Sequence, residues 1–395
     1  MKFIGVKLMK YNQNFSLLEQ NYIFTKLKEK VSQLRANSKL DVIDLGIGDV
    51  KLPLFNCVVS AMKTASEELG NADTFRGYPP SEGYYFLREK IANEYKNFRA
   101  DISADEVFIT DGAKGQLGSI TELFGANLEV LFLSPCYVAG AEANVLRGNK
   151  VTFLTASEKD GFFPSPPYGK TFDLIYICSP NNPTGETMDE NLLSVWVEYA
   201  LNSGSVIIFD GAYSSFISGD YPKSIFCLPN ARKCAIEINS FSKSLGFTGV
   251  RCGYTIIPNE LFELNKLMKR WLGCRFNGVS YVSQRGAEAI FSKSGREEVK
   301  KRINFYKTNA EILKIALKSV NLWYNNTVCS PYVFAKVPKG TTSNDFCELL
   351  LEKTQVVATP GNGFGLGGEG YFRFSALATR DEVLKASDRI SSFKF

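Results

Sequence analysis

Short apolar runs alternate with helix-like segments between about residues 105 and 257, and this alternation constrains the fold more than any other feature of the chain. The runs are short and rich in β-branched side chains, which is typical of buried, mainly parallel strands. The expected strands are 107–109, 130–133, 151–154, 174–177, 206–209, 235–238 and 254–257, and the helices between them include 114–125 and 189–202. The pattern predicts an α/β fold, in which ligands bind at the carboxyl ends of the strands.

A second region follows this alternating segment. Residues 296–319 carry many charges and apolar side chains at helical spacing, which predicts a long amphipathic helix. The runs after it predict strands at 333–337, 356–358 and 371–374 and helices near 343–353 and 380–392. Because 395 residues exceed what one small core holds, we expect two domains. These are a large domain at 46–290 and a smaller α+β domain at 291–395, to which part of an N-terminal arm at 1–45 also belongs.

Composition excludes several classes of protein. The net charge of +5 is mild for this length and no run of five basic residues occurs, so neither nucleic acid nor a membrane is an expected partner. Residues 1–15 lack the apolar core of a signal peptide, and no stretch reaches the roughly 18 apolar residues of a membrane span. The nine scattered cysteines form no CxxC pair, which fits reduced thiols. We therefore expect a cytoplasmic protein.

Histidine does not occur anywhere in the chain. This excludes His-based triads, His–zinc sites and imidazole acid–base catalysis, and we expect no metal site. Proton transfer near neutral pH then requires a lysine, tyrosine, carboxylate or thiol with a shifted pKa. Lys243, in the run SFSKSLG (240–246), is a candidate, because a lysine amine can condense with a cofactor aldehyde and later act as a base. An isolated lysine among serines would instead indicate a solvated turn.

Two other motifs precede Lys243. Asp210 ends the apolar run VIIFD (206–210), which places its carboxylate at the carboxyl edge of the sheet. A buried carboxylate without a cationic partner is energetically costly, so we expect such a partner there. A protonated pyridine nitrogen would supply that cation, whereas a turn or helix-cap aspartate is the alternative. Tyr213 follows three residues later, and Asn182 lies in the run SPNNPTG (179–185). Either side chain could hydrogen-bond the ring oxygen of such a cofactor.

Groups suited to a phosphate occur in the same region. The run DGAKG (111–115) follows an expected strand and opens an expected helix, which supplies backbone N–H groups. Ser240 and Ser242 offer hydroxyls and Arg251 a guanidinium. Tyr137 lies just after another strand, where its ring either stacks on a cofactor or packs in the core. The combination of amine, acid, phenol, amide and guanidinium indicates pyridoxal phosphate (PLP) chemistry.

The C-terminal region contributes one candidate ligand and one misleading motif. Arg373 alternates with apolar neighbours in a strand-like run, so its guanidinium faces either solvent or a substrate carboxylate. The run GFGLGG (363–368) matches GxGxxG, but it lies between two strand-like runs and no expected helix follows it. Because a dinucleotide-binding loop must open a helix, we expect a flexible loop near the substrate instead.

Together these motifs resemble those of the fold-type I, class I/II PLP-dependent aminotransferases, and more narrowly those of the LL-diaminopimelate aminotransferase family. The segments concerned are NYIF (21–24), DLGIGD (44–49), DGAK (111–114), SFSK with GFTGVR (240–251), CRFNG (274–278) and TPG with GFGLGGEG (359–370). The likeness covers nearly the whole chain. It implies the PLP-dependent transferase fold of type I, with a mostly parallel sheet between helices in the large domain.

The resemblance also implies roles for individual residues. Lys243 would be the Schiff-base residue and proton shuttle, with Asp210 on the pyridinium nitrogen and Tyr213 on the ring oxygen. Asn182 would share that oxygen, and Tyr137 would stack on the ring. The phosphate region would consist of Ala113, Lys114, Ser240, Ser242 and Arg251. Arg373 would bind the α-carboxylate, in a substrate pocket completed by Tyr22, Gly48, Lys114, Tyr137, Asn182 and Asn277. Tyr78 and Asn277 would reach across from the second subunit of a homodimer.

The implied reaction exchanges an amino group between LL-2,6-diaminopimelate and 2-oxoglutarate. In reverse, tetrahydrodipicolinate is aminated at the expense of glutamate, for lysine or peptidoglycan precursors. Motifs around PLP do not separate this reaction from that of an aspartate- or aromatic-type transaminase or a carbon–sulfur lyase of the same fold, because the cofactor performs the hard step. A non-enzymatic regulator would need a DNA-binding module, for which the stretch before Gly46 is short and weakly basic. One position departs from the family pattern and concerns selectivity. The acidic residue expected a few positions before Tyr78 is Asp73 here, whose side chain is shorter and would loosen contact with the distal ammonium of the substrate.

Overall fold

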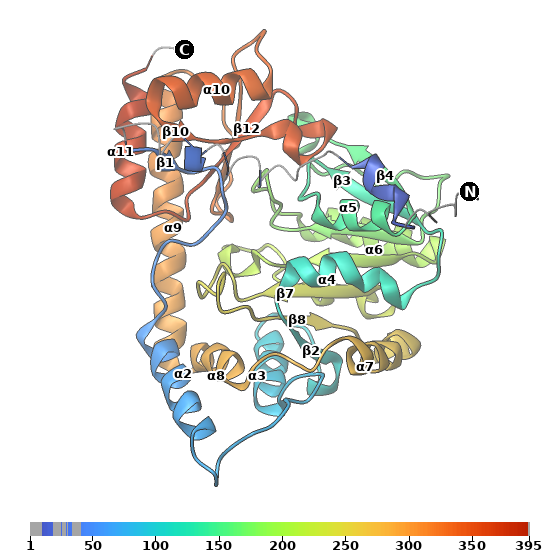
Figure 1. Cartoon of the computed structure of the whole chain (residues 1–395). Coiled ribbons are helices and arrows are strands. Elements are labelled where there is room, and N and C mark those ends of the chain that lie inside the picture. Colours follow the sequence, from blue (N-terminus) through green and yellow to red (C-terminus); the bar gives the residue numbers. More distant parts are fainter. Residues whose placement is uncertain (1–9, 19–24, 26–28, 30, 34–40, 394–395) are drawn as a thin grey trace, which may run out of the picture.

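The computed structural model describes residues 10–18, 25, 29, 31–33 and 41–393. A central sheet lies between helices, and a smaller region containing the C-terminal helices lies beside it (Figure 1). Helix α9 (Lys293–Ser319) runs along one side from the first region to the second. The α/β fold predicted from the sequence is therefore confirmed.

Seven strands form the central sheet, in the order β2-β8-β7-β6-β5-β3-β4. They are β2 (Val107–Thr110), β3 (Glu129–Ser134), β4 (Lys150–Thr155), β5 (Leu174–Cys178), β6 (Val206–Asp210), β7 (Ala235–Ser240) and β8 (Gly253–Ile256). Each expected strand is present, and of the seven only β8 runs antiparallel to its neighbours. The carboxyl ends of β2, β3, β5, β6 and β7 consequently lie at one edge of the sheet.

Helices cover both faces of this sheet. They are α2 (Asn56–Leu69), α3 (Tyr85–Lys96), α4 (Ala113–Ser119), α5 (Ala139–Leu146), α6 (Glu190–Ser203), α7 (Phe262–Arg275) and α8 (Tyr281–Glu288). Trp196 of α6 shares a core with Leu131, whereas Leu117 of α4 shares another with Val130, because successive side chains of a strand face opposite sides. Helix α4 is shorter than the expected 114–125, since Gly118 and Ser119 favour helix poorly and the chain continues as a 3₁₀ turn.

The C-terminal region has its own sheet and core. It contains β9 (Tyr332–Lys336), α10 (Ser343–Thr354), β10 (Val356–Val357), β11 (Thr359–Pro360), β12 (Tyr371–Ser375) and α11 (Arg380–Ser391), and β1 (Ile43–Asp44) pairs with β10. Leu313 of α9, Phe346 and Val383 pack together in this core. Helix α9 begins three residues before the expected position because Ser292 caps it by accepting from the N–H of Gly295. The domain boundaries stay predictions.

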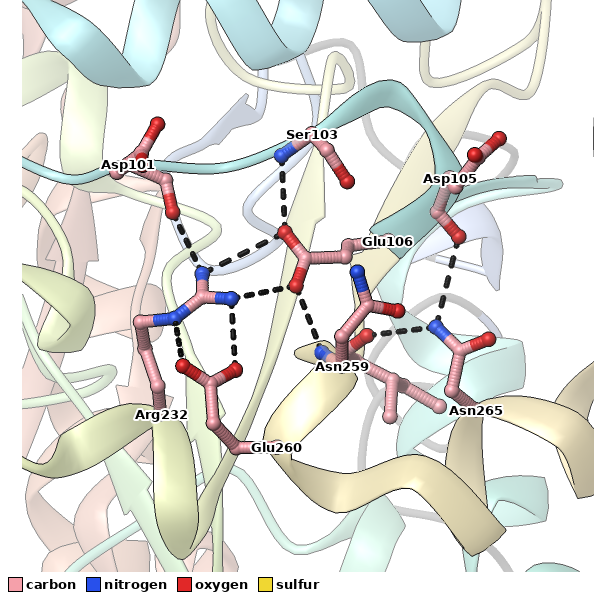
Figure 2. Close-up of polar contacts among 9 residues, drawn as sticks. Asp101, Ser103, Asp105, Glu106, Arg232, Asn259, Glu260 and Asn265 are labelled. Carbon is pink, nitrogen blue, oxygen red and sulfur yellow. Dashed lines mark hydrogen bonds and ion pairs between the residues drawn. The ribbon is translucent and has the colours of Figure 1, made fainter.

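A buried ion pair ties the segment before β2 to the turn that leads into α7 (Figure 2). Arg232 donates to the buried carboxylate of Glu106 at 2.5 Å and to Glu260 at 2.7 Å. Glu106 also accepts from the backbone N–H groups of Ser103 at 2.8 Å and Asn259 at 2.6 Å. These bonds offset the desolvation of Glu106. The network therefore holds the edge strand β2 against the rest of the sheet.

No helix within the described ranges is long and apolar enough to cross a membrane. The same residues contain no cluster of three or more His, Cys, Asp or Glu side chains suited to a metal ion.

Candidate active site

A cavity of about 430 Å³ lies at the carboxyl edge of the central sheet. It brings together twelve residues predicted from the sequence: Gly48, Ala113, Lys114, Tyr137, Asn182, Asp210, Tyr213, Ser240, Ser242, Lys243, Arg251 and Arg373. They come from segments as far apart as the strand β12 and the stretch after β1. A cavity of this size, mostly apolar with a few convergent polar groups, suits a small-molecule ligand.

Asp210 carries a carboxylate into the wall of this cavity. It ends β6, is 7% exposed, and accepts a hydrogen bond from the N–H of Ala212 at 3.0 Å. Burial raises the pKa of Asp210 to about 6. In the part of the chain that the structure describes, no lysine or arginine forms an ion pair with it. A buried carboxylate that lacks a protein cation fits the pyridinium nitrogen of PLP.

Lys243 lies in the turn after β7. Its side chain is half-buried, and Nζ donates to the backbone carbonyl of Gly48. The amine therefore reaches across the cavity toward the segment after β1. This position lies between the carboxyl end of the sheet and the C-terminal region.

A cluster of donors forms one end of the cavity. Gly112 precedes α4 with a φ of +122°, and a Cβ there would lie 2.5 Å from Nη2 of Arg251. Glycine thus lets the guanidinium approach the start of α4. Arg251 also donates to the hydroxyl of Ser242 at 3.3 Å, and the Ser240 hydroxyl donates to Ser242 at 3.0 Å. Guanidinium, hydroxyls and helix N–H groups together fit a phosphate.

Arg373, in strand β12 of the C-terminal region, also lines the cavity. It is 1% exposed, so the alternative that it faces solvent is excluded. Nη1 donates to Oδ1 of Asn182 at 2.7 Å and Nη2 to the carbonyl of Gly46 at 2.5 Å. Its guanidinium lies 4.3 Å from the centre of the Tyr332 ring and 4.8 Å from that of Phe364. These contacts orient the guanidinium at the cavity wall.

Tyr332 is a cavity residue that the sequence analysis missed. Its hydroxyl lies 2.8 Å from that of Tyr213, and burial beside this partner raises the pKa of Tyr213, so the Tyr213 phenol stays protonated near neutral pH. A Cβ on Gly48 would lie 2.5 Å from the Tyr332 hydroxyl, so Gly48 leaves room for it. Tyr332 is the first residue of β9, and no local pattern links it to Tyr213, 119 positions earlier.

Two of the predicted residues that the structure describes, Tyr78 and Asn277, do not line the cavity. Tyr22 lies outside the described residues. Tyr78 is 86% exposed and Asn277 is exposed. Their segments lie side by side, since a Cβ on Gly278 would be 2.6 Å from the carbonyl oxygen of Pro80. Both side chains are thus presented outward from this chain.

The GxGxxG run forms a closely packed loop between β11 and β12. Strand β12 follows it, so no helix start is available to a dinucleotide. The N–H of Gly367 donates to the Ser134 hydroxyl at 3.3 Å, and the N–H of Cys136 donates to the Phe364 carbonyl at 2.9 Å. The flexibility of this loop stays a prediction. The loop lies beside Arg373 and is therefore near the cavity.

Comparison with known proteins places the chain in a class. Residues 40–390 match the family of class I and II aminotransferases, and the chain belongs to this class, whose members depend on PLP. It is 41% identical to the LL-diaminopimelate aminotransferase of Agathobacter rectalis over 98% of this chain and 100% of that protein. The enzyme of the same name from Prochlorococcus marinus NATL2A is 42% identical, with the same coverage. More narrowly, the chain is therefore a member of the LL-diaminopimelate aminotransferase family.

Solved structures agree with this assignment. The L,L-diaminopimelate aminotransferase of Chlamydomonas reinhardtii has a TM-score of 0.90 and 33% identity, over 98% of each chain. A mutant aspartate aminotransferase of Thermus thermophilus has a TM-score of 0.87 at 21% identity, over 97% of this chain and 99% of that one, which reflects the shared fold alone.

Proposed function

We propose that this chain transfers an amino group between LL-2,6-diaminopimelate and 2-oxoglutarate, giving tetrahydrodipicolinate, glutamate and water, or the reverse in precursor synthesis. The observation that carries the proposal is the convergence of Lys243, Asp210 and Arg373 on one cavity. The family membership selects the substrate, because the relatives matched over the full chain bear that name.

Five groups of the cavity would hold PLP. Asp210 would face the ring nitrogen, where a cation relieves its burial, and Tyr213 would donate to the ring oxygen. Asn182 accepts from Arg373 with its oxygen, so its amide N–H₂ is left to reach the same ring oxygen. Tyr137 would stack on the ring, and the cluster around Arg251 would bind the phosphate. When bound, PLP withdraws electrons from the substrate's α-carbon.

Lys243 and Arg373 would act on the substrate itself. Arg373 would bind the α-carboxylate bidentately, with its position set by Asn182 and Gly46. Lys243 would hold the cofactor through Nζ, then accept the proton from the α-carbon and return it to the cofactor. In a chain without histidine, this amine is the group best placed to move that proton.

A coupled assay with 2-oxoglutarate as acceptor tests the reaction. We expect turnover of LL-diaminopimelate to exceed that of meso-diaminopimelate, aspartate and tyrosine. Faster turnover of aspartate or tyrosine would reassign the enzyme to another transaminase type.

Two variants test individual residues. Lys243→Ala should lose both the visible absorbance of the bound cofactor and transamination; retained colour and activity would contradict the role of Lys243. Equal turnover of diaminopimelate by Asp73→Ala and wild type would exclude a contact of Asp73 with the distal ammonium.

The assembly would be a cytoplasmic homodimer, with Tyr78 and Asn277 completing the partner's site. The exposure of both side chains on adjacent segments supports this. Mixing inactive Tyr78→Ala and Lys243→Ala chains tests it, because a mixed dimer then contains one site with both native residues. Activity should return on mixing under conditions of subunit exchange. No recovery, with mixed dimers demonstrated by differential tags, would place Tyr78 in its own chain's site.

A further inference from the structure

A second cavity, of about 440 Å³, lies behind the turn that carries Lys243. It is bounded by α3, by the N-terminal half of α9 and by the stretch 214–218 after β6. Its deepest apolar residues, Ile91, Phe241 and Ile303, are buried. The volume is close to that of the candidate active site. Of the residues given candidate roles above, Ser240 alone also lines this cavity.

Cations surround the mouth of this cavity. Lys223, Lys300 and Lys307 line it together with Arg296, and Glu94 is the lining carboxylate. Glu94 forms an ion pair with Arg296 at 2.5 Å. Among the described residues, no carboxylate lies within ion-pair distance of the three lysines. The rim therefore carries an uncompensated positive charge.

The lysines also lie close enough to affect each other. Burial, together with repulsion from Lys223, lowers the pKa of Lys307. Lys307 Nζ donates to the hydroxyl of Ser218 at 2.9 Å, which directs the ammonium along the cavity wall. Lys223 Nζ lies 5.5 Å from the centre of the Phe98 ring, a second lining residue. Two cations held beside one apolar hollow favour an anion between them.

Hydrogen-bonding groups line the floor beside the apolar residues. Asn239, Ser240 and Ser244 are buried there, and Asn239 Nδ2 donates to the Ser214 hydroxyl at 3.3 Å. Ser240 belongs to both cavities, so one turn of chain separates them. The floor is apolar with a few fixed polar groups, as in sites for small organic molecules.

We propose that this second cavity binds an amphipathic organic anion, with its apolar body on Phe241 and Ile303 and its acidic group at Lys223, Lys300 and Lys307. The ligand class follows from the combination of an apolar floor, hydroxyl and amide donors, and an unpaired cationic rim. A simple inorganic anion would leave the apolar floor uncovered. The site lies apart from PLP, so an occupant and the cofactor bind together.

The probe for the test is 8-anilinonaphthalene-1-sulfonate, an aromatic anion whose fluorescence rises in apolar surroundings. The PLP-loaded enzyme should bind about one probe molecule per chain, saturably and more weakly in high salt. Exchanging Lys223, Lys300 and Lys307 for glutamine together should weaken binding about tenfold or more, because the charges facing the anion are removed. Lys301→Gln is the matched control, since Lys301 is exposed on the same helix but does not line the cavity.

Several outcomes would overturn the proposal. These are equal affinity of the triple variant and Lys301→Gln, no saturable binding to the loaded enzyme, and displacement of the probe by added PLP. Thermal unfolding of each variant checks that the fold is retained. Because all three substitutions keep polar side chains at the rim, unfolding is not expected.

Discussion

Replacing Asp210 with asparagine should stabilise the cofactor-free protein at neutral pH, although it removes the carboxylate proposed to face the ring nitrogen of PLP. Burial raises the pKa of Asp210 from an ordinary 3.8 to about 6. This rise corresponds to about 3 kcal/mol of unfavourable free energy when the folded protein carries the charged form. Asparagine retains an oxygen that can accept from the N–H of Ala212, so the local geometry survives.

The effect has a defined pH dependence. Below about pH 4 the carboxyl is protonated in the folded and unfolded chains, and the variant and wild type have similar unfolding free energies. Between about pH 4 and 6 the folded wild type holds more protons than the unfolded chain, so its unfolding free energy falls as pH rises. Above pH 6 the full penalty is present. The variant does not carry this penalty at any pH.

Thermal unfolding of cofactor-free proteins from pH 4 to pH 8 measures the difference. For a chain of 395 residues, about 3 kcal/mol corresponds to a Tm higher by about 3–4 °C at pH 8. Asp220→Asn, at an exposed aspartate, should leave Tm unchanged. With PLP bound the order should reverse, because only the wild type gains the ion pair. A gap that does not depend on pH, or a less stable variant at pH 8, would refute the reasoning.

Three further substitutions probe other contacts. Gly112→Ala should weaken PLP binding about tenfold or more, measured by cofactor titration, because its Cβ would displace the Arg251 guanidinium. Arg232→Ala should lower the free energy of unfolding by about 3 kcal/mol, measured by denaturant unfolding, because it leaves the buried Glu106 without its cation. Tyr332→Phe should reduce kcat/KM roughly 2- to 10-fold by removing one neutral hydrogen bond to the Tyr213 hydroxyl.

Each of these variants has a control. Gly249→Ala should not affect PLP affinity, because nothing lies within 4 Å of its added Cβ. Arg99→Ala removes an exposed ion pair at 3.5 Å and should cost under about 1 kcal/mol. Tyr168→Phe, at an exposed ring, should leave kcat/KM unchanged. If a control changes the measured quantity as much as its variant does, the contact given as the reason for that variant's effect is contradicted.

Much of the fold was predictable because its signals are local. Each strand of the central sheet is a short apolar run, and burial on both faces makes that run visible without knowledge of its neighbours. Asp210 was recognisable for the same reason, since it follows such a run directly. The early end of α4 was missed, because its periodic pattern continues while Gly118 and Ser119 weaken the helix.

The candidate site was predictable only in part. Motifs near strand ends pointed to Lys243 and Arg251, which line the cavity; burial excludes solvent exposure for Arg373, and its binding of a ligand stays a prediction. Tyr332 was missed, because its value depends on contacts with Tyr213 across 119 residues. The contributions of Tyr78, Asn277 and Tyr22 stay predictions.

The sequence alone determined the class of fold and excluded histidine catalysis, and it predicted the amine and the acid proposed for the cofactor chemistry. Those properties depend on residue type and on spacing within a few positions. Only the tertiary structure decided that Arg373 is buried against Asn182, that the Tyr332 and Tyr213 hydroxyls meet, and that Lys223, Lys300 and Lys307 line a second cavity with no ion-pair partner among the described residues. The physical reason is that burial and charge pairing are properties of a neighbourhood assembled from distant segments, which no local pattern encodes.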